Sequence, residues 1–449
     1  MTCESEMPVN PACSSSAASS ATPCVRVTPL AQLQASDLPG SPAGALRVPA
    51  LLALLDGTLL LVHDHRPPVA ASGWQRSGGA LPGDLPNPNT LWLRRSTDAG
   101  ATWSAPQQLT PGPGCSQVRG LSDPSLLLGS DGTIHLFAAA ATDVGLFGAH
   151  CPTRPAVPNA PAEPGTLRLL HAYSRDAGAS WNWRDLSDLC LPGPGQPTGL
   201  VAFPVSGHGL SLTGPCQPGR LLQPLVTALP PGPDGSRPVR ARALLSDDAG
   251  ASWFLGQEVP PPAQSATKSL AGGAATSGVD EWAVAELADG TLVLSARDGG
   301  YGGTRLQAHS SDGGQSWSLP EAATELPDPG CNAALLALPG TRALLCTHAS
   351  DPRSRQQGRL SLSLDGGTTW RPLAALTGAQ EPFGYSEACL LPTAAAHRTA
   401  AGYTELADRP ELSDHTKLAA PWGQTRLVVV AEQPYNAQDA GLQVFAVDL

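Results

Sequence analysis

One eight-residue pattern, Ser-x-Asp-x-Gly-x-x-Trp, occurs five times in this chain of 449 residues and constrains its fold more than any other feature. The five copies begin at Ser96, Ser174, Ser246, Ser310 and Ser363, so that successive copies start 78, 72, 64 and 53 residues apart. These intervals are too long for one hairpin per repeat, and each suits one four-stranded sheet.

The residue types in the pattern are those of a hairpin turn. Asp and Ser side chains accept hydrogen bonds from the turn's own N–H groups, Gly adopts positive φ, and Trp folds back beneath the hairpin as a large apolar side chain. Alternating runs opened by Asp-Gly pairs, at residues 56–63 and 289–295, are typical of strands. We therefore expect an all-β chain in which the aspartates of the pattern are structural.

Composition supports this fold class and excludes several kinds of partner. Gly (48 residues) and Pro (46 residues) are abundant, as in chains of many short strands joined by turns. The net charge of -11, without a run of Lys or Arg, argues against a nucleic acid or an anionic membrane surface as partner. The ten cysteines show no metal-binding spacing, so we expect reduced thiols and neither a metal nor another cofactor.

The start of the chain carries Glu4 and Glu6 and lacks the basic and apolar segments of a secretory signal. No apolar run reaches the length of a membrane span. We therefore expect a cytoplasmic protein, with a secreted or lysosomal location as the alternative. Residues 1–40 are rich in Ser, Ala and Pro and predict a disordered leader, followed by a single domain over residues 41–449 with its first strand near Ala43.

The five turns resemble the Asp boxes of the bacterial-type sialidase (neuraminidase) family, and the resemblance extends from Ala43 to about Leu449. It implies a six-bladed β-propeller of four-stranded antiparallel blades. Asp boxes also occur in propellers that have no hydrolase activity, so the repeat indicates a fold and not a reaction.

Sialic acid carries a carboxylate on its anomeric carbon, and recognition of that group favours the rigid, planar fork of arginine over lysine. The family uses three such arginines. The resemblance assigns these roles to Arg47, in a Leu-Arg-Val-Pro stretch, to Arg297 at the end of a predicted strand, and to Arg355. Arg353 and Arg359 are close competitors for the third role.

A carboxylate nucleophile would meet the carboxylate of the substrate, and sialidases use a tyrosine instead. A phenol has a reference pKa near 10 and needs a neighbouring base to become a nucleophile. The resemblance implies Tyr385, in a Gly-Tyr-Ser stretch, as nucleophile and Glu281, 16 residues before Arg297, as its base. Glu286, on the same predicted strand, is the alternative base.

The family also places an acid in a loop after an Asp-x-Arg element. Here Asp64-His65-Arg66 supplies that element, and Asp84 in the following loop is the implied acid/base, with Arg66 contacting the sugar. Asp64 is the substitute acid, although it lies on the same strand face as Arg66 and is better suited to orient it. The loop from Pro67 to Gly83 is longer than the family pattern.

Three further residues are implied as substrate contacts or their supports. Asp123, in an Asp-Pro-Ser segment, would contact the sugar, and Phe147 would line an apolar pocket for the N-acetyl group. Glu405 would hold Arg47 as an ion-pair partner.

The resemblance thus implies a monomeric exo-α-sialidase that removes terminal sialic acid from oligosaccharides, glycoproteins or glycolipids with retention of configuration. A non-catalytic Asp-box binding module and a trans-sialidase built on the same site are the alternatives. A binding module could use the arginines, but it would have no use for a phenol beside a base.

Overall fold

The computed structural model describes ten stretches of the chain: residues 25–40, 43–68, 83–112, 115–191, 200–229, 237–263, 268–269, 275–391, 425–433 and 440–449. Among them, no helix is long and apolar enough to span a membrane. The only helical elements in these stretches are the short 3-10 turns η1 (Ala35–Asp37), η2 (Leu146–Gly148) and η3 (Ser187–Cys190).

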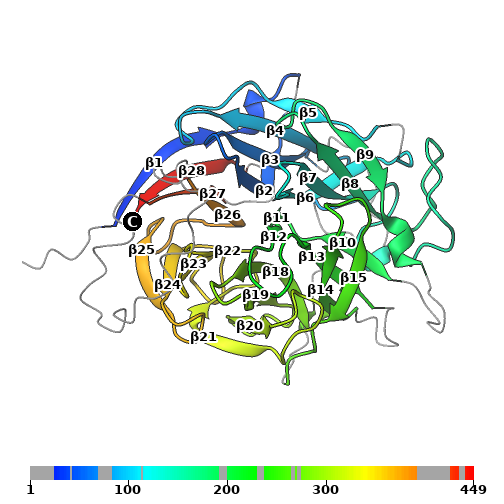
Figure 1. The fold of residues 1–449 in the computed structure, drawn as a ribbon. Coiled ribbons are helices and arrows are strands. Elements are labelled where there is room, and N and C mark those ends of the chain that lie inside the picture. The colour runs from blue at the N-terminus through cyan, green and yellow to red at the C-terminus, as the bar shows by residue number, and fades with distance from the viewer. Residues whose placement is uncertain are drawn as a thin grey trace, which may run out of the picture.

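Six antiparallel sheets form a closed ring, and the predicted six-bladed β-propeller is confirmed (Figure 1). The first blade consists of β2 (Ala45–Ala53), β3 (Leu59–Arg66), β4 (Thr90–Ser96) and β5 (Gln107–Leu109). The second consists of β6 (Gly120–Leu128), β7 (Ile134–Ala141), β8 (Leu167–Ser174) and β9 (Asn182–Asp185). The third consists of β10 (Val201–Pro204), β13 (Leu221–Ala228), β14 (Val239–Ser246) and β15 (Phe254–Glu258). The fourth blade consists of β18 (Val279–Glu286), β19 (Leu292–Asp298), β20 (Thr304–Ser310) and β21 (Glu321–Pro327). The fifth consists of β22 (Ala334–Ala337), β23 (Leu344–Ala349), β24 (Gly358–Ser363) and β25 (Arg371–Ala375). The sixth consists of β26 (Ser386–Leu390), β27 (Arg426–Glu432), β28 (Leu442–Asp448) and β1 (Arg26–Leu33).

Four short strands lie outside this scheme. β11 (Gly207–His208) runs parallel to β6, and β12 (Leu210–Ser211) pairs with β13. β16 (Lys268–Ser269) and β17 (Ala275–Thr276) pair with each other between the third and fourth blades.

Each predicted box forms the turn between the third and fourth strands of its blade. In the first, Ser96 Oγ donates to Asp98 Oδ1 at 2.8 Å, and the Thr102 N–H donates to the same carboxylate oxygen at 2.8 Å. The other four boxes repeat both bonds. The hydrogen bonds from Thr102 lower the pKa of Asp98 to about 2, so this carboxylate is used within its own turn.

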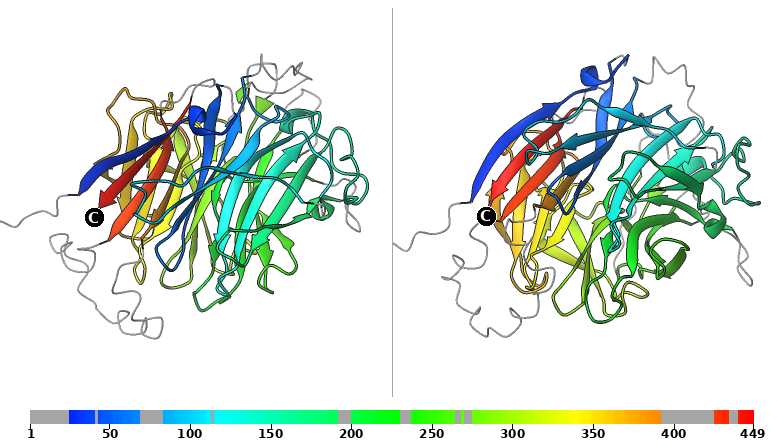
Figure 2. Two further views of the ribbon diagram at one scale, coloured as in Figure 1. Left: turned by 90° about the horizontal axis from the view of Figure 1, so that it is seen from above. Right: turned by 45° about the horizontal axis from the view of Figure 1, so that its top comes forward.

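The sixth blade has no box because its outer strand comes from the other end of the chain. β1 pairs antiparallel with β28, with Arg26 opposite Asp448 and Leu33 opposite Leu442. Both views in Figure 2 show the two strands, blue and red, side by side. The prediction of a disordered leader over residues 1–40, with the propeller beginning at 41, is therefore wrong for Arg26–Leu33. The remaining part of that leader up to residue 24 lies outside the described residues.

A segment around β11 crosses the centre of the ring and joins three blades (Figure 1). β11 pairs with β6, His208 Nδ1 lies 2.9 Å from Glu387 Oε1 on β26, and Asn332 Nδ2 donates to the Ser206 carbonyl at 2.8 Å. Gly207 has φ 126°, and a Cβ there would lie 2.2 Å from a Glu387 carboxylate oxygen. The segment therefore needs glycine at the point where it meets the ion pair.

Burial lowers the pKa of His208, but the Glu387 carboxylate raises it by more, so that the net pKa is above the ordinary 6.5. A histidine whose pKa is higher in the folded state than in the unfolded state stabilises the fold when it is protonated. This contribution is complete at pH values below the pKa of the unfolded state and is lost as pH rises through the pKa of the folded state. We therefore expect the free energy of unfolding to fall from pH 6 towards pH 9 with a component that His208→Gln removes. Urea titrations across this range measure it.

The exposed His309 gives the matched control, because His309→Gln should keep the wild-type slope. At pH 6, Glu387→Gln should cost about 3–5 kcal/mol, since it leaves one member of a buried pair without its partner. An unchanged slope in His208→Gln would show that other groups set the pH dependence.

Candidate active site

Backbone irregularities at the inner strands of three blades turn polar side chains towards the axis. The register shifts between Arg47 and Ala50 in β2, between Ser122 and Ser125 in β6, and between Val279 and Trp282 in β18. Within the first two bulges, Val48 (φ 49°) and Asp123 (φ 54°) adopt the left-handed region although neither is glycine. Bulges of this kind commonly re-aim side chains beside functional sites.

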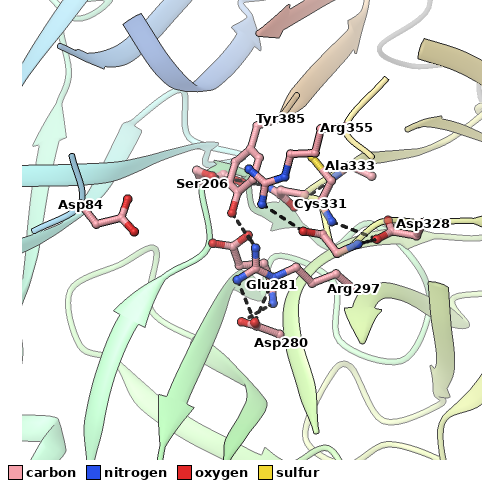
Figure 3. A network of polar contacts seen from close by, with 12 residues as sticks. Asp84, Ser206, Asp280, Glu281, Arg297, Asp328, Cys331, Ala333, Arg355 and Tyr385 are labelled. Carbon is pink, nitrogen blue, oxygen red and sulfur yellow. Dashed lines mark hydrogen bonds and ion pairs between the residues drawn. The ribbon is translucent and has the colours of Figure 1, made fainter. Parts of the chain in front are cut away.

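The three predicted arginines come from three blades and meet around Tyr385. Figure 3 shows two of them, Arg297 and Arg355, beside this tyrosine. Arg297 Nη1 donates to the Tyr385 hydroxyl at 2.8 Å. The Cζ atoms of Arg47 and Arg355 lie 5.6 Å and 4.9 Å from the centroid of the Tyr385 ring. We call these three side chains the arginine clamp.

Two buried carboxylates hold two members of the clamp. Glu432, at the end of β27, accepts from Arg47 Nε at 2.9 Å and from Nη2 at 3.2 Å. Asp280 Oδ2 accepts from Arg297 Nε at 2.9 Å and lies 2.8 Å from its Nη2. In both pairs the planar fork of the guanidinium is fixed by bonds that a lysine could not reproduce.

Sequence reasoning missed both of these carboxylates. It proposed Glu405 as the partner of Arg47, and Glu405 lies outside the described residues. Glu432 is the single charge that ends the apolar run Leu427–Ala431, and this was the only signal that could have identified it. Asp280 directly precedes Glu281 and could have been proposed as a partner for that reason.

The third member of the clamp is held by a backbone group. Arg355 Nη2 donates to the Gly330 carbonyl at 3.0 Å. Of its competitors, Arg353 is exposed, and Arg359 lies on β24, opposite Ala375 of β25. The geometry therefore places Arg355, and neither competitor, over Tyr385.

Glu281 lies beside Tyr385 and forms an ion pair with Arg297, whose Nη1 is 3.1 Å from its Oε2. Burial raises the pKa of Glu281, while Arg297 and a hydrogen bond from Tyr385 lower it, and the net direction is upwards. Burial also raises the pKa of Tyr385 well above 10, against the lowering effect of Arg297, so the phenol is protonated at neutral pH. The alternative base, Glu286, instead accepts from the Thr213 N–H at 2.7 Å and is engaged in a turn.

Arg66 links the predicted acid to its support. Its Nε donates to Asp64 Oδ2 at 2.9 Å, and its Nη1 pairs with Asp84. The Asp64 side chain is fully buried and also accepts from Ser122 Oγ at 2.6 Å, whereas the Asp84 side chain is 42% exposed. Asp64 thus orients Arg66, as the sequence predicted, and Asp84 is the accessible carboxylate.

The described end of the Asp84 loop is tied down by two asparagines. Asn87 donates from its backbone to the Asp84 carbonyl and from its side chain to the Pro67 carbonyl, both at 3.0 Å. The side chain of Asn89 donates to the Gly83 carbonyl at 3.0 Å. Residues 69–82 of this loop lie outside the described residues.

Two predicted sugar contacts have different surroundings. Asp123 belongs to the same acidic group, because burial and the charges of Glu281 and Asp64 raise its pKa well above the ordinary range in spite of Arg66. Phe147 lies half-buried in η2, and its carbonyl accepts from Arg237 Nη1 at 3.3 Å. The role of its ring in binding an N-acetyl group stays a prediction.

The fold and the five box turns define a six-bladed Asp-box propeller with an arginine-rich centre, and comparisons with known proteins agree. Residues 117–397 match the family model described as a BNR repeat-like domain. A sialidase of Micromonospora viridifaciens is 33% identical over 333 residues, which are 72% of this chain and 45% of that protein. A sialidase of Bacteroides fragilis is 26% identical over 347 residues, 74% of this chain and 55% of that protein.

Among solved structures, the NanB sialidase of Streptococcus pneumoniae superposes with a TM-score of 0.63 at 15% identity, covering 94% of this chain and 70% of that one. A leech intramolecular trans-sialidase superposes with a TM-score of 0.61 at 17% identity, covering 90% and 68%. At these identities the two superpositions support the fold alone. The chain belongs to the bacterial-type sialidase family with BNR repeats, and it spans about half the length of the two curated relatives.

The arginine clamp predicts that ligand affinity falls when one guanidinium group is replaced by the ammonium group of a lysine. Arg297→Lys should weaken binding of free N-acetylneuraminic acid by about 10- to 100-fold, because a lost charge-assisted hydrogen bond is worth roughly 1.5–3 kcal/mol. Calorimetric titration measures the loss. Arg426→Lys is the matched control, since Arg426 at the start of β27 pairs with Asp448 at the end of β28 and both side chains are exposed. Equal affinities in wild type and Arg297→Lys would remove Arg297 from the clamp.

Proposed function

We propose that this chain is an exo-α-sialidase that hydrolyses terminal, α-ketosidically linked sialic acids with retention of configuration. One observation carries the proposal: three arginines from different blades surround a single tyrosine that has a glutamate beside it. A ligand bound there would meet three permanent cations and a neutral nucleophile. Among terminal sugars, one with a carboxylate at its anomeric carbon matches this arrangement.

In the first step, the arginine clamp binds the carboxylate and brings the anomeric carbon to the Tyr385 oxygen. Glu281 accepts the phenolic proton as that oxygen attacks. The raised pKa of Glu281 makes it a stronger base than an ordinary carboxylate, and it must be ionised to act. Arg297, which donates to the phenol oxygen, stabilises the negative charge that develops on it.

Asp84 donates a proton to the glycosidic oxygen as the leaving group departs. In the second step the same residue takes a proton from water, which attacks the anomeric carbon, while Glu281 returns its proton to Tyr385. Two inversions at one carbon give net retention. Arg66, bonded to both Asp64 and Asp84, keeps the acid at its place in the loop.

Residues outside the arginine clamp contact the rest of the sugar. We assign Asp123 to the polar substituents on the ring and Phe147 to the N-acetyl group, with oligosaccharides, glycoproteins or glycolipids as the source of the substrate. Incubation of the protein with a fluorogenic aryl sialoside and chromatography of the products tests the function. Free sialic acid supports hydrolysis, whereas an intact substrate would favour a binding module.

A trans-sialidase is the second candidate, because two intramolecular trans-sialidases share the fold at TM-scores of 0.61. Hydrolases and transferases share the covalent intermediate and differ in the acceptor that resolves it. The same chromatography separates them, since an anhydro sugar or a new sialoside would replace free sialic acid.

The assignment of Asp84 as acid predicts a dependence on the leaving group. Asp84→Asn should lower kcat/KM about 10²- to 10⁴-fold for a sialyl-galactoside, whose alkoxide must be protonated, and far less for a nitrophenyl sialoside. Steady-state kinetics on both substrates give the ratio. Asp247→Asn is the matched control, because Asp247 is an exposed carboxylate that also pairs with an arginine, the buried Arg220. An equal loss on both substrates would argue against an acid role.

The assignment of Tyr385 as nucleophile predicts a covalent adduct. A 3-fluorosialyl fluoride should add one sugar to the protein, because the ring fluorine slows breakdown more than the fluoride leaving group slows attack. Peptide mass analysis should place the sugar on Tyr385, and Tyr385→Phe should not be labelled. A label on Asp84 or Glu281 would overturn the mechanism, and activity without any label would indicate an inverting route.

A further inference from the structure

The turn between β19 and β20 holds a tyrosine in a conformation that favours glycine. Tyr301 has φ 56° and lies among Gly299, Gly300, Gly302 and Gly303, any of which would adopt that conformation without strain. The Asp298 carboxylate accepts from the Gly300 and Gly302 N–H groups at 2.8 Å and 2.9 Å. The turn is therefore built to present one aromatic side chain, four residues after Arg297 of the clamp.

The Tyr301 ring packs against the backbone that holds Arg355. A Cβ on Gly330 would lie 2.2 Å and 2.3 Å from two carbons of the Tyr301 ring, so the ring lies directly against this glycine. The carbonyl of the same glycine accepts the hydrogen bond from Arg355 Nη2. Its N–H donates to Asp328 Oδ1 at 2.5 Å, and the glycine is thereby fixed on both sides.

The charges that act on Tyr301 are those of the active site. Burial is the largest influence on the pKa of Tyr301 and raises it, Arg297 and Arg355 lower it, and Asp280 and Glu281 raise it. The phenol therefore lies within electrostatic range of two members of the clamp. Gly303, in the same turn, also faces the loop that carries Arg355, because a Cβ there would lie 3.6 Å from Pro352 Cβ.

We propose that Tyr301 is a positioning residue of the arginine clamp: its ring holds Gly330 in place, and through the Gly330 carbonyl it fixes Arg355 against Tyr385. The proposal rests on the proposed function, in which the clamp binds the carboxylate of sialic acid. It assigns the ring, and not the hydroxyl, as the acting part of the side chain.

The test compares a ligand that has the carboxylate with one in which it is masked. The 2,3-unsaturated analogue of N-acetylneuraminic acid and its methyl ester are titrated calorimetrically against wild type, Tyr301→Ala, Tyr301→Phe and Arg355→Ala. Tyr301→Ala should lose about 10-fold or more in affinity for the acid and stay within about twofold for the ester, since only the acid uses a full charge-assisted bond to Arg355. Its acid-to-ester ratio should approach that of Arg355→Ala, whereas Tyr301→Phe should keep the wild-type ratio.

General damage to the fold would lower both affinities together, and for this reason the ratio is the readout. Tyr173→Ala is the matched control, because Tyr173 lies on β8 with Arg175 over its ring at 5.3 Å and should keep the wild-type ratio. If Tyr301→Ala does not fold, Tyr301→Leu replaces it with the same expected fall in the ratio.

Three results would overturn an assignment, and they are distinguishable. A wild-type ratio in Tyr301→Ala shows that Arg355 does not depend on this ring. An equal loss in Tyr301→Phe and Tyr301→Ala shows that the hydroxyl itself contacts the ligand. Equal binding of acid and ester by the wild-type protein removes the clamp, and the proposed function fails with it.

Discussion

The arrangement at the centre of this propeller depends on buried carboxylates that fix positive charges close to one another. Three guanidinium groups around one phenol would repel each other, and each loses hydration on burial. Glu432 and Asp280 counter both effects, because each supplies a negative charge and contacts two nitrogens of one guanidinium group. The inner strands, their bulges and the order of the blades serve to bring these pairs together.

The acidic side chains divide into two groups by their surroundings. Glu432 and Asp280 each contact two nitrogens of one guanidinium group of the clamp, whereas Glu281 and Asp123 have raised pKa values because burial outweighs the nearby cations, which for Glu281 include its ion-pair partner Arg297. A raised pKa makes a carboxylate a stronger base, and two contacts to one guanidinium group hold an arginine in a fixed orientation. Asp280 and Glu281 illustrate the difference, because these neighbouring carboxylates share Arg297 as partner, and Glu281 also accepts a hydrogen bond from Tyr385.

Much of this could be predicted from the sequence. The five boxes determined five blades, because Ser, Asp, Gly and Trp at fixed spacing have one local structure, and the three arginines with Tyr385 and Glu281 followed from short family motifs. β1 was missed because Arg-Val-Thr-Pro-Leu-Ala-Gln-Leu lacks alternation and contains Pro29, and its strand character comes from a partner more than 400 residues away. Glu432 was missed for a similar reason, since its role depends on a residue in another blade and on no motif of its own.

The pairing of β1 with β28 also determines when the molecule can be completed during synthesis. The Gln443 side chain donates to the Ala31 carbonyl across 412 residues of chain, so β1 has no partner in its blade until β28 has been synthesised. An unpaired strand edge is a template for aggregation in that interval. Pro29 lies at the register shift in the pairing of β1 and has no backbone N–H to donate. The unpaired edge of β1 is therefore a poorer template for a strand of a second chain.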